Sequence, residues 1–404
     1  MGLIDEKTPE NSKEVLDKIR KKEIIDYNNY RITGDIKIDK SILEMGQLES
    51  QITIKDSHIE GELYIEDIVF FGNIQFERTT FSGPVTIKNC RIDPGSRPSE
   101  PTFSFINCKF EKKILFDHIV FTHFLLKDSK IKRDVKFEHI LFEKTANFHK
   151  TCFNGQIHVT DCYFTLYANF DGVVFGDVAN FVRTTFKYAT FFQKYVDKNK
   201  KVHFCIFKKR AIFNEVTFHE ETVFDEAQFL DELIFKKSNF LYTLSLKGTC
   251  IMFLKDREIA YRKAKKASED HGFYSDATHY YIDEMKAIRE QKPWYIRIPE
   301  LVLFDWFLGY GVKPERIIIS WVGIVVLFAI GVYASKGISG VNGGDLINDW
   351  VNSLEFSIMR ATTPGVIGFQ VNDNFKIFAF IEALIGTYFW AGIIACIGKK
   401  FLRV

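Results

Sequence analysis

The chain has 404 residues, which is long enough for two or three folded units. Its 54 lysine and arginine residues nearly balance 52 acidic residues, so the net charge of +2 gives no indication of a nucleic-acid partner. Phenylalanine occurs 41 times, far more often than usual, and this excess requires a structural cause.

Residues 1–35 are predicted to form a short helix that caps the unit after it. The stretch 12–19 has apolar residues at helical spacing, and Ser12 is the expected N-cap. The exposed end of a stacked solenoid needs such a cap.

Residues 36–254 repeat in steps of five and six, so that pairs of apolar residues recur every eleven positions. The pairs are Ile54/Ile59, Ile65/Phe70, Phe76/Phe81, Ile87/Ile92, Phe105/Phe110, Phe116/Phe121, Leu126/Ile131, Phe137/Phe142, Phe148/Phe153, Val159/Phe164, Phe170/Phe175, Phe181/Phe186, Val202/Phe207, Phe213/Phe218, Phe224/Phe229, Phe235/Phe240 and Leu246/Ile251. An insertion at 93–102 and an irregular stretch at 193–201 interrupt them. A coil with flat sides and one inward residue per side explains these steps, and their persistence indicates a solenoid.

The units at 168–175 (Ala-Asn-Phe-Asp-Gly-Val-Val-Phe) and 179–186 (Ala-Asn-Phe-Val-Arg-Thr-Thr-Phe) resemble the phenylalanine-centred form of pentapeptide repeats. That family folds as an all-β, right-handed quadrilateral β-helix. The resemblance implies two eleven-residue units per coil, with phenylalanines filling the interior. At a strand spacing of ~4.8 Å, about nine coils give a rod roughly 40 Å long.

Other readings of the repeat region are weaker. Some pentapeptide-repeat proteins mimic DNA through an acidic surface, but acids and bases nearly balance here. The basic runs at 198–201 and 208–210 are solvated faces or contacts for anionic lipid headgroups. The histidines form no close metal-binding set in the sequence, so no metal site is predicted; they are His58, His118, His123, His139, His149, His158, His203 and His219.

The cysteines also lack a metal-binding spacing; they are Cys90, Cys108, Cys152, Cys162, Cys205, Cys250 and Cys396. We therefore predict buried, reduced thiols of a cytosolic domain. No nucleophile–base arrangement, phosphate-binding glycine loop or carboxylate pair is visible, so the chain is not expected to be an enzyme. The N-terminal residues contain no apolar segment, and no cleaved signal peptide is expected.

Residues 255–292 are predicted to form a helical hairpin that breaks at His271 and Gly272. The order Ala-Tyr-Arg-x-x-Lys, then Gly, then Ala-x-x-x-Tyr-x-x-Glu-Met is similar to the linker of pentapeptide-repeat channel proteins. A plain connection and a regulatory element both fit this pattern. Residues 293–316 are rich in aromatic side chains but too charged to span a membrane, which predicts an interfacial helix.

Residues 317–404 contain two apolar segments, at about 317–333 and 375–398. A hydrocarbon core ~30 Å thick needs roughly 20 apolar residues of helix, so both qualify as membrane spans. Between them lies a shorter amphipathic piece, 353–368, that ends in Thr-Thr-Pro-Gly-Val-Ile-Gly. Non-helical backbone is tolerated at membrane depth only where it lines a water-filled path or is buried in protein.

This order resembles the two-transmembrane pore domain of the potassium-channel superfamily. Ser357 precedes Thr362 and Thr363 at the family spacing, and Ile-Glu-Ala-Leu-Ile-Gly at 381–386 is similar to the start of many prokaryotic second helices. The resemblance implies an all-α pore domain, four copies around one pore and a filter of backbone carbonyls. One departure is that Pro-Gly-Val-Ile stands where the family has Val-Gly-Tyr-Gly.

The resemblance also assigns the candidate site residues. The filter residues are Thr362, Thr363, Pro364, Gly365, Val366, Ile367 and Gly368. The residues that support the filter are Ser357, Arg360 and Glu382. The hinge and inner-pore residues are Gly386, Thr387, Trp390 and Ile394. We predict an ion pair between Glu382 and Arg360; alternatively, Glu382 is protonated or Arg360 lies in the outer vestibule.

Flanking charge predicts the orientation. Lys313 and Arg316 precede the first span, and Lys399, Lys400 and Arg403 follow the second. The connecting loop, 334–374, holds few bases. The positive-inside rule therefore places both termini and the β-helix in the cytoplasm of a two-span cell-membrane protein.

Three functions follow from this organisation. The first is a homotetrameric cation channel in the lipid bilayer, conducting K⁺ or Na⁺ without a cofactor or nucleic acid, with an unknown regulatory partner. The second is a membrane-anchored, non-conducting scaffold whose β-helix binds a partner. The third is a soluble interaction protein whose apolar helices are core.

Overall fold

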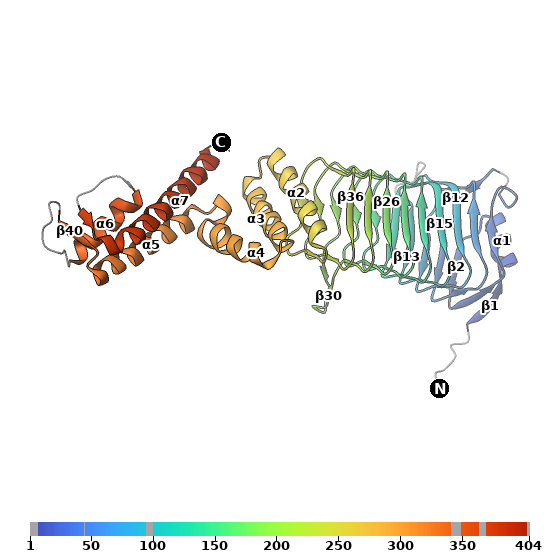
Figure 1. The fold of residues 1–404 in the computed structure, drawn as a ribbon. Coiled ribbons are helices and arrows are strands. Elements are labelled where there is room, and N and C mark those ends of the chain that lie inside the picture. The colour runs from blue at the N-terminus through green and yellow to red at the C-terminus, as the bar shows by residue number, and fades with distance from the viewer. Residues whose placement is uncertain (1–6, 44, 94–99, 341–348, 363–368, 402–404) are drawn as a thin grey trace, which may run out of the picture. The chain divides into compact units, whose positions relative to one another are not determined.

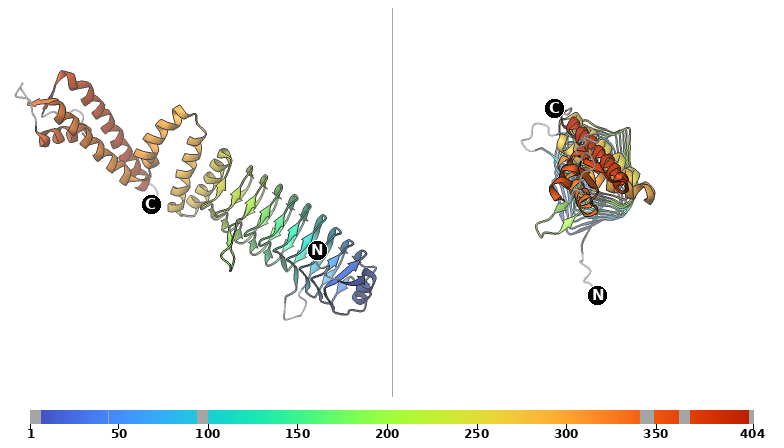
Figure 2. Two further views of the ribbon diagram at one scale, coloured as in Figure 1. Left: turned by 90° about the horizontal axis from the view of Figure 1, so that it is seen from below. Right: turned by 60° about the vertical axis from the view of Figure 1, so that its left-hand side comes forward.

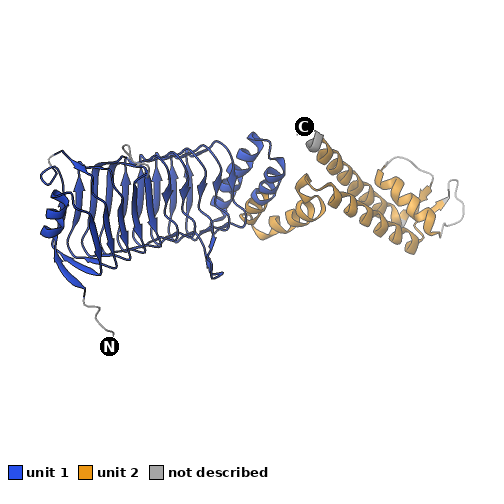
Figure 3. Cartoon of the chain, turned by 180° about the vertical axis from the view of Figure 1, so that it is seen from behind, with its two compact units in different colours: residues 1–284 blue, residues 285–404 orange. Residues whose placement is uncertain are grey.

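The computed structural model describes residues 7–43, 45–93, 100–340, 349–362 and 369–401. The chain divides into two compact units, residues 1–284 and residues 285–404 (Figure 3). Stacked strands dominate the first unit, and helices dominate the second (Figure 1).

The first unit is a β-helix-like solenoid of short parallel strands (Figures 1 and 2). One sheet contains β1 (Thr8–Asn11), β3 (Tyr30–Thr33), β7 (His58–Ile59), β11 (Thr80–Phe81), β14 (Lys109–Phe110), β17 (Lys130–Ile131), β21 (Cys152–Phe153), β25 (Val174–Phe175), β31 (Ile206–Phe207), β35 (Gln228–Phe229) and β39 (Cys250–Ile251). A second contains β2 (Ile25–Asn28), β6 (Ile52–Lys55), β10 (Ile74–Glu77), β13 (Thr102–Ile106), β16 (His123–Lys127), β20 (Ala146–Asn147), β24 (Ala168–Asn169), β28 (Thr190–Phe191), β34 (Thr222–Val223) and β38 (Leu244–Ser245).

The third sheet has two branches that meet at the long strands β12 and β15. It contains β4 (Ile36–Ile38), β5 (Gln47–Leu48), β8 (Leu63–Glu66), β9 (Val69–Phe70), β12 (Val85–Ile92), β15 (Ile114–Phe121), β18 (Val135–Glu138), β19 (Leu141–Phe142), β22 (Ile157–Thr160), β23 (Tyr163–Phe164), β26 (Ala179–Val182), β27 (Thr185–Phe186), β32 (Ala211–Asn214), β33 (Thr217–Phe218), β36 (Leu233–Lys236) and β37 (Asn239–Phe240). In the regular stretch, Phe137 pairs with Val159 and Val159 with Phe181, so one coil takes 22 residues.

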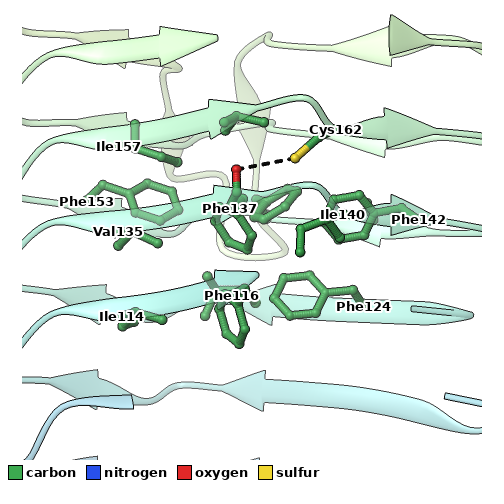
Figure 4. Close-up of a cluster of buried hydrophobic side chains, with 14 of the residues drawn as sticks. Ile114, Phe116, Phe124, Val135, Phe137, Ile140, Phe142, Phe153, Ile157 and Cys162 are labelled. Atoms are coloured by element: carbon green, nitrogen blue, oxygen red, sulfur yellow. Dashed lines mark hydrogen bonds between the residues drawn. The ribbon is translucent and has the colours of Figure 1, made fainter. Parts of the chain in front are cut away.

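The phenylalanine excess fills the solenoid interior, as predicted. Successive coils stack like residues on one another, as for Phe170 and Phe192, whose ring centroids are 4.6 Å apart. Figure 4 shows the same layering for Phe116 and Phe137, with centroids 5.1 Å apart. Buried aromatic pairs of this kind contribute about 0.5–1.5 kcal/mol beyond their burial.

One inward position was predicted wrongly. Val202 is 42 % exposed, whereas Phe192 is fully buried and takes the inward position eleven residues after Phe181. The residues after Phe192 form an antiparallel hairpin, β29 (Tyr195–Val196) and β30 (Val202–His203), that leaves the coil. The eleven-residue pattern therefore extends to Phe192, one residue before the irregular stretch at 193–201. The hairpin is an insertion into the solenoid after Phe192.

Small side chains before the inward phenylalanines bind the coils together. Thr184 Oγ1 donates to the Val159 carbonyl at 3.1 Å, and Ser238 Oγ donates to the Phe213 carbonyl at 2.7 Å. Cys162 occupies the same position and directs its thiol to the Phe137 carbonyl at 3.4 Å (Figure 4). Buried cysteines of the solenoid are thus small weak donors in a repeated slot.

The seven cysteines form no disulfide in the described part of the chain, but the prediction that they are buried holds for five; Cys152 is half-buried and Cys250 is exposed. Burial raises the pKa of the Cys90, Cys108 and Cys162 thiols to about 12. These thiols stay protonated well above neutral pH and are poor nucleophiles, because the thiolate is the reactive form.

We therefore expect iodoacetamide at pH 8 to label Cys250 first in the native protein, and the buried thiols of the solenoid only after unfolding. Mass spectrometry of labelled peptides measures the order. The variant Cys250→Ser should lose the fast-reacting thiol; labelling of Cys162 at the same rate as Cys250 would contradict this account.

Helices cover both ends of the solenoid. At the first end lies α1 (Ser12–Arg20), and its N-cap is Asn11, whose Oδ1 accepts from the Lys13 amide at 3.0 Å; the predicted Ser12 cap is wrong by one residue. At the other end, α2 (Leu254–Asp270) buries Ala260, Ala264 and Ala267 in the core of the solenoid. These alanines allow the helix to approach closely.

The helix α3 (Tyr274–Glu290) follows α2 and packs against it. Its Glu284 is buried and accepts from Arg262 Nε at 2.8 Å and from Lys265 Nζ at 2.7 Å. Tyr280 accepts at its hydroxyl from the Leu246 amide at 3.1 Å, in the last coil. The hairpin is therefore fixed to the end of the solenoid.

After the end of α3, the second unit continues with a run of three short helices: α4 (Trp294–Glu300), the π-helix η1 (Leu301–Phe307) and the 3₁₀-helix η2 (Gly309–Gly311). The remaining elements are α5 (Pro314–Ser335), β40 (Ile338–Gly340), α6 (Trp350–Thr362), β41 (Phe369–Val371), the 3₁₀-helix η3 (Asp373–Phe375) and α7 (Lys376–Phe401). Trp294, Tyr295 and Trp306 are strongly exposed, which suits aromatic side chains at a membrane surface.

Candidate functional site

Two helices of the second unit, α5 and α7, are long and apolar enough to cross a membrane. Only 28 % of the most apolar window of α5 and 22 % of that of α7 is buried, whereas a core helix of a soluble protein would be mostly buried. Their large exposed apolar residues are Ile318, Ile319, Val322, Val326, Leu327, Ile330, Ile377, Phe380, Ile381, Leu384, Trp390, Ile394 and Ile397. These faces are left for lipid or for another chain.

The shorter helix α6 packs against both α5 and α7. Phe356 of α6 contributes to a buried cluster with Val332 of α5 and Ala379 of α7. Beside this cluster, β40 and β41 pair antiparallel, with Ile338 opposite Val371. The chain segments before and after α6 are therefore tied to each other at one end of the helices.

The predicted filter begins where α6 ends. Thr362 is the last residue of α6, and its hydroxyl donates to the Ile358 carbonyl at 2.8 Å. The other predicted filter residues lie outside the described residues; they are Thr363, Pro364, Gly365, Val366, Ile367 and Gly368. Their assignment stays a prediction.

Gly386 of α7 lies directly against the end of α6. A Cβ atom built on Gly386 would stand 2.5 Å from the carbonyl oxygen and 2.6 Å from the Cα of Ala361. Real Cβ atoms essentially never come this close to backbone atoms, so only glycine permits this packing. The predicted hinge at Gly386 is a separate property and stays a prediction, since α7 is continuous here.

Glu382 lies one turn before Gly386 on α7, and its side chain is buried at 1 % exposure. Neither of its carboxylate oxygens nor the buried Ser357 Oγ has a hydrogen-bond partner among the described residues. Ser357 and Arg360 are the α6 groups close enough to Glu382 to interact with it electrostatically. The three predicted filter-support residues therefore lie close together where the end of α6 meets α7. An ion pair of Glu382 with Arg360 stays a prediction.

Arg360 also lines a cleft of the second unit, whose volume is about 580 Å³. Phe369, Gln370 and Val371 of β41 also line this cleft, as do Asp373 and Lys376. Arg360 thus lies near the buried Glu382 and also lines an open cleft. An ion pair with Glu382 and a place in the outer vestibule both stay predictions for Arg360.

The predicted inner-pore residues share one face of α7, because they are three and four residues apart. Thr387, Trp390 and Ile394 are all exposed in this single chain. Trp390 makes an edge-on contact with Trp321 of α5 at a centroid distance of 6.2 Å. Their role in lining an inner pore stays a prediction.

A polar cluster that sequence reasoning did not single out precedes α5. Arg289, in the last turn of α3, donates from Nη1 to Asp305 Oδ2 of η1 at 2.7 Å and to the Tyr310 hydroxyl at 2.7 Å. The Arg289 and Asp305 side chains are 10 % and 17 % exposed, so this ion pair is largely buried. Asp305 is the single charged residue of an otherwise apolar, aromatic run, 301–310. A lone acid in such a run indicates a buried partner of opposite charge, and this was the signal in the sequence.

The solenoid also holds a histidine pair that the prediction of no close set missed. His118 and His139 lie on neighbouring coils, together with Asp117. The signal was present in the sequence as Phe-Asp-His-Ile at 116–119 and Phe-Glu-His-Ile at 137–140, one coil apart.

Comparison of the chain with models of protein families, with curated proteins and with solved structures found no match, so no family is shown.

Proposed function

We propose that this chain is one subunit of a homotetrameric cation channel, with a β-helical domain attached to a two-span pore domain. The observation that carries the proposal is a 13-residue helix, α6, packed against two helices of membrane-spanning length. Behind its last turn lies a buried polar group, Ser357 and Glu382, at the point where the filter motif begins. A buried ionisable residue within a membrane span is expected to serve a function.

Several copies are needed because two spans cannot enclose a pore. The exposed apolar residues of α5 and α7 fit contacts with lipid and with neighbouring subunits, and closed rotational symmetry is the usual arrangement of homo-oligomers. The filter would be formed by backbone carbonyls from Thr362 to Gly368, which replace the hydration shell of K⁺ or Na⁺.

For the solenoid, we propose the right-handed quadrilateral β-helix of pentapeptide-repeat proteins. The 22-residue coil and the stacked inward phenylalanines support this assignment. With both termini in the cytoplasm, as the flanking bases indicate, α4 and η1 would lie at the inner surface of the membrane. Their exposed Trp294, Tyr295 and Trp306 suit that position.

Purified full-length protein in liposomes tests the proposal. We expect flux of monovalent cations that is absent from empty liposomes. Absence of flux under every voltage and pH tested would favour the non-conducting membrane scaffold. Recovery of the protein in the soluble fraction of cells would favour the soluble interaction protein, which the exposed apolar faces of α5 and α7 already disfavour.

The same preparation tests selectivity, and we expect poor discrimination between K⁺ and Na⁺. The family's second glycine and its aromatic residue are replaced by Ile367 and Val366, and a β-branched residue resists the positive φ that glycine adopts. Fewer ordered carbonyl rings then dehydrate the ion. Sign selectivity should remain, because carbonyl oxygens and the C-terminal ends of the α6 helices attract cations.

Reversal potentials in a planar bilayer, with K⁺ on one side and Na⁺ on the other, measure this discrimination. A reversal near the potassium equilibrium potential would contradict poor selectivity and would favour a shifted filter in which Gly368 supplies the second glycine. A reversal at the chloride potential would contradict a cation channel altogether.

A further inference from the structure

The histidine pair of the solenoid stands at one corner of two successive coils. His118 in β15 and His139 between β18 and β19 both have positive φ, 53° and 55°. The preceding residues, Asp117 and Glu138, pair in the parallel ladder, so the two corners are held in register by the backbone. The backbone position of each histidine is therefore set by the stacking of the coils.

The side chains of this corner converge on one carboxylate oxygen. Asp117 Oδ1 lies 2.6 Å from His118 Nδ1 and 3.2 Å from His139 Nδ1. The two imidazole rings stack with centroids 4.3 Å apart and planes at 22°, and one ligand atom from each residue lies within 4.8 Å of the others. We propose that Asp117, His118 and His139 bind a divalent transition-metal ion such as Zn²⁺.

The donor set and its spacing support this class of ion. Zinc binds imidazole nitrogen and carboxylate oxygen at about 2.0–2.2 Å, so two ligands of a tetrahedral ion stand about 3.3 Å apart. The two distances from Asp117 Oδ1 lie within about 0.7 Å of this value, and the stacked imidazole rings must turn apart so that both Nδ1 atoms point at one ion. Two nitrogen donors and one oxygen favour zinc, nickel or copper over calcium and magnesium, which prefer oxygen ligands. Water would complete the coordination, because the histidine side chains are 57 % and 49 % exposed.

Another carboxylate lies on the outer side of His139. Asp161, at the same corner one coil further, has an oxygen 3.8 Å from His139 Nε2. Arg183 fixes this carboxylate through two hydrogen bonds of 2.7 Å. When His139 Nδ1 binds a metal, its proton must reside on Nε2, which faces Asp161. Carboxylates that orient the outer nitrogen of a ligating histidine are common at metal sites.

Isothermal titration of full-length protein in detergent with ZnCl₂ tests the site. We expect wild-type protein to bind Zn²⁺, and His118→Asn and His139→Asn to weaken this binding at least tenfold. Asparagine suits these positions because it tolerates positive φ, and Asn89 occupies the same corner one coil earlier with φ of 49°. His219→Asn is the matched control, since His219 is outside the cluster, and should bind Zn²⁺ as the wild type does.

Two further readouts separate the site from adventitious binding. Co²⁺ bound at this site should give visible d–d absorption that both corner variants lose. Zn²⁺ should raise the Tm of the solenoid in the wild type but not in the corner variants, because a ligand of the folded state stabilises it. Equal Zn²⁺ binding by wild type and both variants, or no binding at 1 mM ZnCl₂, would overturn the proposal.

Discussion

Replacing Gly386 by alanine is expected to reduce ion flux at least tenfold and to destabilise the pore domain. The new Cβ would meet the Ala361 carbonyl oxygen at 2.5 Å and the Ala361 Cα at 2.6 Å. Both are backbone atoms of α6, so the clash cannot be relieved by a side-chain rotation. The end of α6 must move, and the proposed filter begins at the next residue.

The sign of the stability change distinguishes this packing role from a hinge. Alanine is favoured over glycine in a helix by about 1 kcal/mol, so loss of a hinge alone would lower flux while stabilising α7. Overpacking typically costs about 1–3 kcal/mol, which outweighs that gain. We therefore expect Gly386→Ala to lower the Tm of the detergent-solubilised protein as well as the flux.

Gly323→Ala in α5 and Gly398→Ala in α7 are matched controls, because a Cβ at either position has no neighbouring atom within 4 Å in the described part of the chain. Both should conduct and melt like the wild type or slightly above it. Unchanged flux and Tm in Gly386→Ala would contradict the close approach. Lower flux with a higher Tm would instead support the hinge.

The solenoid was largely predictable because its core repeats. Each coil must place a residue of similar size at the same point above its neighbour. Phenylalanine therefore recurs in the sequence at steps of five and six, and this period predicts the solenoid. Val202 was misassigned because the hairpin β29–β30 restores the apolar spacing by coincidence. Local periodicity cannot tell an inward residue from one on an inserted hairpin of the same phase.

The contacts of the second unit were less predictable. The sequence shows a glycine at 386, but its approach to Ala361 depends on how α6 and α7 cross, which no local pattern records. The Arg289–Asp305 ion pair likewise joins α3 to η1 through the fold. The His118–His139 pair was within reach, since residues one coil apart at a corner must be neighbours once the coil length is known.

Neutralising Glu382 is also expected to have a large effect on ion flux. If Glu382 and Arg360 form the predicted ion pair, Glu382→Gln and Arg360→Gln should each lower ion flux about tenfold and weaken assembly of the channel, because each removes one member of that pair. Removal of one member of a buried ion pair typically costs about 3–5 kcal/mol. Glu355→Gln is the matched control: Glu355 is an exposed acid of the same α6, and its neutralisation should leave flux unchanged.

The double variants decide whether Glu382 and Arg360 act as a pair. If they do, the double variant Glu382→Gln/Arg360→Gln buries no unpaired charge, and it should be less impaired than the sum of its single changes. The swapped variant Glu382→Arg/Arg360→Glu should also recover part of the flux. Strictly additive losses, with no recovery in the swap, would mean that the two residues act separately, with Glu382 protonated among Ser357 and its apolar neighbours and Arg360 facing the cleft beside β41.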